Sequence, residues 1–114
     1  MHIGSNDVRF GVSGEALINA FQQVAKRVRK TYRRVFVTTI LPGGYPPEQA
    51  EQRLLANTWM LWQESQWFDA VFDFATPLRS PEDEAVLNPA DSGDGVHPND
   101  EGYQLIAAAW ISAN

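Results

Sequence analysis

An acid and an imidazole stand three residues apart near the end of the chain, as Asp94 and His97, and Pro98 follows directly. A turn of this length brings the carboxylate against one ring nitrogen, which fixes the tautomer of the imidazole and stabilises the imidazolium. Pro98 disfavours helical dihedrals at His97, so we expect the ring at the end of a loop. A base held in this way activates a hydroxyl nucleophile. The other interpretation of the pair is a solvated turn.

A second polar motif, Gly4-Ser5-Asn6-Asp7, lies at the other end of the chain. Gly4 gives the backbone the freedom that a tight turn requires, and such a turn leaves the Asn6 side chain projecting from the end of a strand. We expect Asp7 to accept backbone hydrogen bonds within the turn. The alternative for Asn6 is that it caps the loop.

A third short motif is Asn57-Thr58-Trp59. Together with the two motifs above, it resembles the SGNH, or GDSL-type, hydrolases, a family of esterases, lipases and acylhydrolases. In that family an Asn-x-Trp often lies in the penultimate helix. The resemblance covers essentially the whole chain and implies a three-layer α/β/α domain with a parallel sheet. It also implies part of a catalytic triad, in which His97 is the base and Asp94 orients it, while Asn6 donates its amide N–H to the oxyanion.

The nucleophile that this resemblance implies has no counterpart in the sequence. In the family the serine stands in a Gly-Asp-Ser motif after the first strand, and a glycine from a second block supplies another oxyanion N–H; neither block occurs here. Ser92 is close in sequence to Asp94, but nothing in the sequence directs its hydroxyl to His97. No serine follows a strand in a Gly-Asp-Ser or Gly-x-Ser-x-Gly context. The six serines are Ser5, Ser13, Ser65, Ser80, Ser92 and Ser112.

We therefore expect residues 1–114 to be the C-terminal portion, somewhat over half, of one SGNH hydrolase domain whose first strands lie upstream. Only the last residues of a strand, Met1 to Ile3, precede the Gly4 turn. The sheet edge would then be incomplete there, and an exposed edge favours self-association. We expect the chain alone to be inactive, and any export signal would precede Met1.

Hydrophobic periodicity predicts the elements that carry these motifs. Apolar side chains recur at helical spacing over about residues 14–30 and again over about 48–64, and Ser13 is a candidate N-cap of the first helix. Residues 35–41 are rich in β-branched side chains, which predicts a strand buried on both faces, and residues 68–74 predict the next strand. The alternation of strands and helices predicts right-handed βαβ crossovers.

Two loops are expected at the ligand-binding edge of this sheet, because each follows the carboxyl end of a strand. The first, residues 42–47, contains Tyr45, which could contact substrate or simply cover the loop. The second, residues 76–93, is long and polar and leads to the acid and the imidazole. Asp73 is expected to cap a helix or pin a loop there, and its alternative role is that of a second active-site carboxylate. Asn99 is expected to cap the closing helix.

Composition limits the classes of function. The 114 residues suffice for one domain, and the absence of cysteine excludes disulfides and thiolate chemistry. A net charge of −5 argues against nucleic acid as the main partner. Six of the nine Lys and Arg lie between residues 26 and 34, where they complement the dipole of a helix C-terminus. No apolar run is long enough to span a membrane.

We expect a small-molecule ester as substrate, with no metal and no cofactor. Asp91, Asp94 and His97 could also be interpreted as metal ligands, but their spacing matches no established site. The alternative function is a non-catalytic α/β binding or assembly module that uses the open sheet edge, an idea motivated by the missing nucleophile. A flavodoxin-like phosphate binder ranks last, because the chain has no Gly-rich phosphate loop at a strand-to-helix junction.

Overall fold

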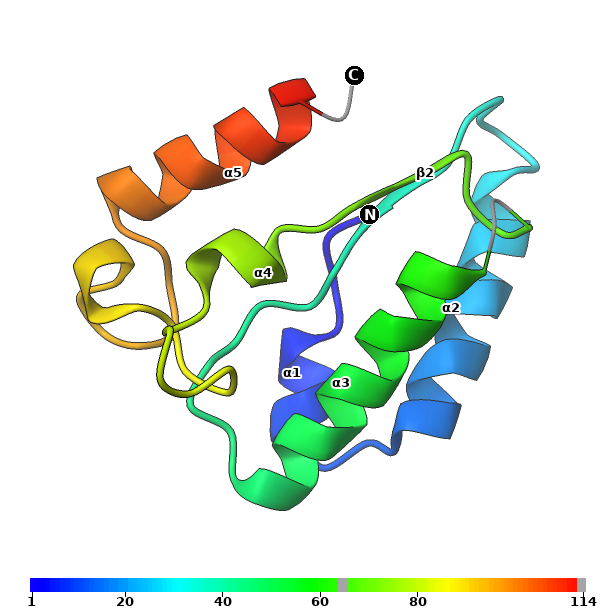
Figure 1. The fold of residues 1–114 in the computed structure, drawn as a ribbon. Helices are drawn as coiled ribbons and strands as arrows, with labels where there is room; N and C mark the ends of the chain where they lie inside the picture. The colour runs from blue at the N-terminus through cyan, green and yellow to red at the C-terminus, as the bar shows by residue number, and fades with distance from the viewer. Residues whose placement is uncertain (64–65, 113–114) are drawn as a thin grey trace.

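The fold is a small α/β sandwich, described by a computed structural model over residues 1–63 and 66–112. Two short parallel strands pair at the centre, α2 and α3 cover one face, and α5 covers the other, so that three layers result (Figure 1). In chain order the elements are α1 (Ser5–Arg9), α2 (Gly14–Val28), β1 (Phe36–Thr38), α3 (Pro47–Trp62), β2 (Ala70–Phe72), α4 (Ala75–Leu78), the 3-10 helix η1 (Pro89–Asp91) and α5 (Asp100–Ser112).

Side chains alternate across the sheet and bury both of its faces. Val37 and Val71 pack into the core formed with α2 and α3. Phe36 and Phe72 point the other way, where the indole of Trp110 in α5 stacks on Phe72 with ring centroids 4.2 Å apart. A sheet buried on both faces is the arrangement that parallel strands require. The predicted α/β architecture with a parallel sheet is therefore confirmed.

Both strands are shorter than predicted, and side chains from α3 take over the backbone that follows β1. The sequence predicts strands over residues 35–41 and 68–74, whereas β1 and β2 have three residues each. Beyond β1, the N–H of Ile40 donates to Oδ1 of Asn57 at 2.7 Å, and its carbonyl accepts from Nδ2 of Asn57 at 2.9 Å. Nη1 of Arg53 donates to the same carbonyl at 3.0 Å. The backbone of Ile40 is thus satisfied by α3 and takes no further part in the sheet.

Met1 extends the sheet on the side of β1 away from β2. Its ammonium donates to the carbonyl of Phe36 at 2.6 Å, and the N–H of Thr38 donates to the carbonyl of Met1 at 3.0 Å. This is the bonding pattern of a parallel ladder, so the main chain of His2 faces the outer side. Within the part of the chain that the structure describes, the His2 main chain makes no hydrogen bond.

The predicted helix caps are present. Oγ of Ser13 accepts from the N–H of Ala16 at 3.2 Å, and Oδ1 of Asn99 accepts from the N–H of Gly102 at 3.0 Å. Helix α2 ends at Val28, two residues before the predicted end. The predicted end of the next helix at residue 64, like Ser65, lies outside the described residues. None of the described helices combines the length and the apolar character needed to cross a membrane.

The region predicted as one long loop, residues 76–93, contains short regular elements. It begins within α4, contains an isolated antiparallel bridge between Arg79 and Leu87, and ends in η1. The expected capping role of Asp73 is found there, because its carboxylate accepts from the N–H of Thr76 at 3.2 Å and from the hydroxyl of Thr76 at 2.5 Å. Helices of three or four residues carry no hydrophobic period, so the sequence pattern did not reveal them.

Candidate active site

Asp94 and His97 lie together in the loop between η1 and α5. Nδ1 of His97 is 2.8 Å from Oδ2 of Asp94. The other carboxylate oxygen, Oδ1, accepts from the main-chain N–H of Val96 at 2.8 Å and of His97 at 2.7 Å. Gly95 closes the turn with φ at 77°, a conformation that glycine adopts without strain. The sequence therefore builds a compact turn in which the acid contacts both the ring and the backbone of the histidine.

These hydrogen bonds hold the pKa of Asp94 well below its ordinary value of 3.8. The largest cause is the bond from the His97 ring, followed by the main-chain N–H groups of His97 and of Val96. An ionised carboxylate accepts from Nδ1–H, which leaves Nε2 of His97 as the proton acceptor of the ring. Among the described residues, Nε2 has no hydrogen-bond partner, and the two side chains are 57% (Asp94) and 75% (His97) exposed.

The two flanking helices hold this loop at its ends. Gly102, in the first turn of α5, lies so close to η1 that an added Cβ would be 2.5 Å from the carbonyl oxygen of Asp91. That same carbonyl accepts from the N–H of Asn99 at 2.8 Å, and Nδ2 of Asn99 donates to the carbonyl of Ala90 at 3.0 Å. The loop that carries Asp94 and His97 is thus held by packed backbone at both of its ends.

Asn6 lies in α1, where the sequence predicts an open turn. Gly4 precedes this helix with φ at 111°, as expected for a sharp change of chain direction after a strand. The Asn6 side chain is exposed and lines a hollow of about 320 Å³ together with residues 2–5 and 7. Both α1 and the loop before α5 lie on the side toward which the strands lead (Figure 1). No hydrogen bond joins Asn6 to Asp94 or His97 within the described residues.

Tyr45 is buried in the core, with 6% of its surface exposed. The guanidinium of Arg9 lies 5.1 Å from its ring centroid, and Nη2 of Arg9 donates to the carbonyl of Gly43 at 3.2 Å. The ring therefore covers the loop of residues 42–47 from inside, which is one of the two interpretations that the sequence allows. A contact between Tyr45 and substrate stays a prediction.

None of the five serines that the structure describes directs its hydroxyl at the ring of His97. Ser13 caps α2, Ser80 accepts from the N–H of Glu82 at 3.3 Å, and Ser112 donates to a carbonyl of its own helix. Ser5 lies in the first turn of α1. Ser92 donates to the main-chain carbonyl of His97 at 2.7 Å, away from the ring nitrogens.

Comparison with known families identifies the family of this chain. The model of the GDSL-like lipase/acylhydrolase family matches residues 1–105. The chain belongs to this family. Among curated proteins, no sequence matches it.

Solved structures share the fold of this chain. A GDSL-like lipase from Bacteroides thetaiotaomicron superposes with a TM-score of 0.76 at 22% sequence identity, over 98% of this chain and 58% of that chain. An α/β hydrolase enzyme from the metagenome of Lake Arreo, Spain, superposes with a TM-score of 0.70 at 21% identity, over 99% of this chain and 57% of that chain. The GDSL-like fold is shared, and the chain spans less than two thirds of the length of either protein.

A second imidazole, that of His2, lies beside the Asn6 motif of this GDSL-like chain, and none of the sequence motifs indicates it. Nδ1 of His2 is 2.5 Å from Oγ1 of Thr38, and His2 lines the same hollow as Asn6. Burial is the larger cause that lowers the pKa of His2, and the N-terminal ammonium adds to it. The available signal was a histidine two residues before Gly4, inside an otherwise apolar strand end.

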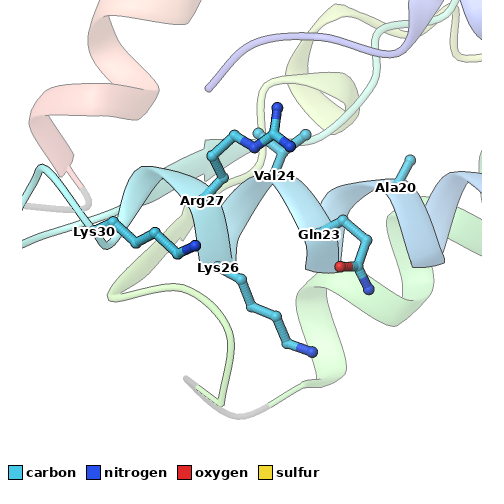
Figure 2. Close-up of a pocket in the computed structure, with 6 residues that line it drawn as sticks. All are labelled: Ala20, Gln23, Val24, Lys26, Arg27 and Lys30. Atoms are coloured by element: carbon cyan, nitrogen blue, oxygen red, sulfur yellow. The ribbon is translucent and has the colours of Figure 1, made fainter.

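A larger hollow, of about 500 Å³, lies along the outer face of α2, away from these residues (Figure 2). Its lining comes from this one helix, and Figure 2 shows the side chains of Lys26 and Arg27 extending in opposite directions. It is therefore an open basic surface. Across residues 1–63 and 66–112, no cluster of three His, Cys, Asp or Glu side chains could hold a metal ion.

Proposed function

We propose that this chain is the part of a GDSL-type serine ester hydrolase that carries the base and its orienting acid, and that the nucleophilic serine comes from a segment outside residues 1–114. The observation that carries this proposal is the 2.8 Å contact between Nδ1 of His97 and Oδ2 of Asp94, which leaves Nε2 free. Membership of the GDSL-like lipase/acylhydrolase family supports the class of reaction.

In this proposal, Nε2 of His97 takes the proton of the serine hydroxyl while the serine oxygen attacks the carbonyl carbon of a small-molecule ester. The ionised Asp94 stabilises the imidazolium, and the amide N–H of Asn6 donates to the tetrahedral oxyanion. The imidazolium then protonates the departing alcohol. Water, deprotonated by the same ring, attacks the acyl-enzyme, releases the carboxylic acid and restores the serine.

The outer edge of the sheet is the proposed place for the segment that carries the serine. The main chain of His2 faces outward and makes no hydrogen bond within the described residues, so a further parallel strand could pair there. The carboxyl end of such a strand would lie at the same rim of the sheet as Asn6, because Asn6 follows the strand-like residues 1–3. A serine hydroxyl at the end of that strand would face the space between the Asn6 amide and the His97 imidazole.

The test joins this chain to an upstream segment that contains Gly-Asp-Ser and measures hydrolysis of p-nitrophenyl acetate. We expect turnover from the joined protein and none from the chain alone, because only the joined protein contains the nucleophile. His97→Ala in the joined protein should lower kcat by about 10³-fold or more. Asn19→Ala, an exposed substitution on α2, is the matched control and should leave kcat unchanged.

Turnover that survives His97→Ala in the joined protein, or that the chain alone already supports, contradicts the proposal. A joined protein that folds but is inactive would favour the non-catalytic binding or assembly module. A stable, monodisperse monomer or dimer of the chain alone in gel filtration would support that alternative.

A further inference from the structure

Ser92 lies inside the loop that carries the acid and the base, and its role is not explained by the proposed reaction. It is buried, with 6% of its surface exposed. Its Oγ is 2.7 Å from the carbonyl oxygen of His97 and 2.9 Å from the nitrogen of Gly95. Oδ1 of Asp94 lies farther away, at 3.4 Å. Since a hydroxyl has one proton, Ser92 donates to the His97 carbonyl and accepts from the Gly95 N–H.

Backbone contacts of this kind matter because packing does not hold the two side chains in place. Asp94 is 57% and His97 75% exposed, so few neighbours restrict either of them. The Asp94 carboxylate accepts from the main-chain N–H of His97 at 2.7 Å, but Asp94 is itself largely exposed. Ser92 bonds the carbonyl of His97 from a buried position.

The neighbourhood of Ser92 explains why it can act as a fixed point. It follows η1 directly, and the carbonyl of the preceding residue, Asp91, accepts from the N–H of Asn99 at 2.8 Å. Gly102 packs against this carbonyl and connects η1 to the first turn of α5. Ser92 therefore links the packed helices η1 and α5 to the main chain of His97 in the loop between them.

We propose that Ser92 is a positioning residue of the esterase site, which holds the main chain of His97 so that the ring stays against Asp94. This inference rests on the proposed function. It also assigns Ser92 a role other than nucleophile, because its hydroxyl is bonded to a carbonyl and not to Nε2 of the base. A merely structural role would change the stability of the loop without changing the state of the ring.

The first test uses the chain as it is and does not depend on activity. Nitrogen-15 NMR of the neutral His97 ring measures which ring nitrogen carries the proton. We expect the Nδ1–H form in the wild type, because Asp94 accepts from it, and a mixture of both forms in Ser92→Ala. Ser92→Thr keeps the hydroxyl and should retain the wild-type form.

Ser80→Ala is the matched control. Ser80 is also buried, at 9% exposure, and its hydroxyl also accepts a main-chain N–H, that of Glu82 at 3.3 Å. It lies between α4 and η1 and makes no hydrogen bond with the acid or the base. Ser80→Ala should leave the His97 tautomer as in the wild type. If Ser92→Ala does not fold, Ser92→Cys replaces it with the same expectation, since a thiol is a weak donor.

The second test uses the joined protein. Ser92→Ala should lower kcat by about 10- to 100-fold while KM changes by less than about 2-fold, since a displaced base affects the chemical step more than substrate binding. Ser92→Thr should restore most of kcat. A Ser92→Ala protein whose tautomer and kcat both match those of Ser80→Ala overturns the inference, and so does covalent acylation of Ser92 itself. Activity that survives His97→Ala overturns the proposed function, which is a different outcome.

Discussion

Hydrogen bonds determine the orientation of the polar side chains near Asp94 and His97. The spacing of Asp94 and His97 and the proline that follows were enough to predict an acid and an imidazole in contact. The sequence could not reveal Ser92 or His2, because their partners are set by the folded backbone. The carbonyl that Ser92 bonds is defined by the turn at Gly95, and the Thr38 hydroxyl that His2 contacts lies 36 residues away.

The lowered pKa of Asp94 can be tested directly. Its pKa lies below the ordinary value of 3.8, so the ionised carboxylate stabilises the folded state above that pH. This stabilisation is lost as the pH falls through the lower pKa of the folded state. Carbon-13 NMR of the side-chain carboxyl should therefore show Asp94 still ionised at ~pH 3.

His97→Ala is the control for this titration. It removes the ring, which is the first cause of the shift, so the pKa of Asp94 should move back toward 3.8. A wild-type midpoint at or above 3.8 would show that the acid is not held by the ring and the backbone, and would remove the basis for its orienting role.

The sequence predicts helices of several turns, but it does not predict very short helices or the exact ends of strands. Helix α2 was predictable, because apolar residues recur at helical spacing from Leu17 through Phe21 to Val28, and Leu17 and Phe21 are buried. The five residues of α1 are too few for a period, so Asn6 was expected in a turn. The ends of β1 were not predictable from its own sequence, since the amide of Asn57, 17 residues away, takes the backbone of Ile40 out of the ladder.

The contact between α5 and η1 gives a prediction at the scale of elements. Gly102→Ala should lower the free energy of unfolding by about 1–3 kcal/mol, although alanine is the better helix former by about 1 kcal/mol. The physical reason is that the new Cβ would lie 2.5 Å from the carbonyl oxygen of Asp91 and 2.8 Å from Cβ of Pro98. Urea unfolding followed by circular dichroism measures the change.

Gln104→Ala provides the matched substitution in the same helix. Gln104 is exposed, so its replacement should change the free energy of unfolding by less than about 0.5 kcal/mol. If Gly102→Ala is as stable as Gln104→Ala, or more stable than the wild type, then the helix can move away from η1. The loop between them would then lack the rigid ends on which the positioning of His97 depends.

At the scale of the whole molecule, the order of elements was the most predictable property. A helix, a strand, a second helix, a second strand and a closing helix imply a parallel sheet with right-handed crossovers, and the GDSL-like family match agrees. Within residues 1–63 and 66–112, regular strand pairing is limited to Phe36–Thr38 and Ala70–Phe72, with Met1 beside them. The sequence could not show how little ladder remains, because Arg53, Asn57 and Thr39 replace backbone partners with side-chain groups.

We propose that the active site is divided between this chain and a further segment that carries the nucleophilic serine. The chain spans 58% of the length of the lipase from Bacteroides thetaiotaomicron. It carries the exposed imidazole of His97, the proposed base, whose Nε2 has no partner among the described residues. A serine that approaches the rim beside Asn6 would give that base a proton to accept.

Covalent labelling of the joined protein with a fluorophosphonate probe, followed by peptide mass mapping, tests where the nucleophilic serine lies. We expect a label on the serine of the added Gly-Asp-Ser segment, and its loss in His97→Ala and after denaturation. Labelling of that serine at an undiminished rate in His97→Ala, or a label on any serine within residues 1–114, would contradict it.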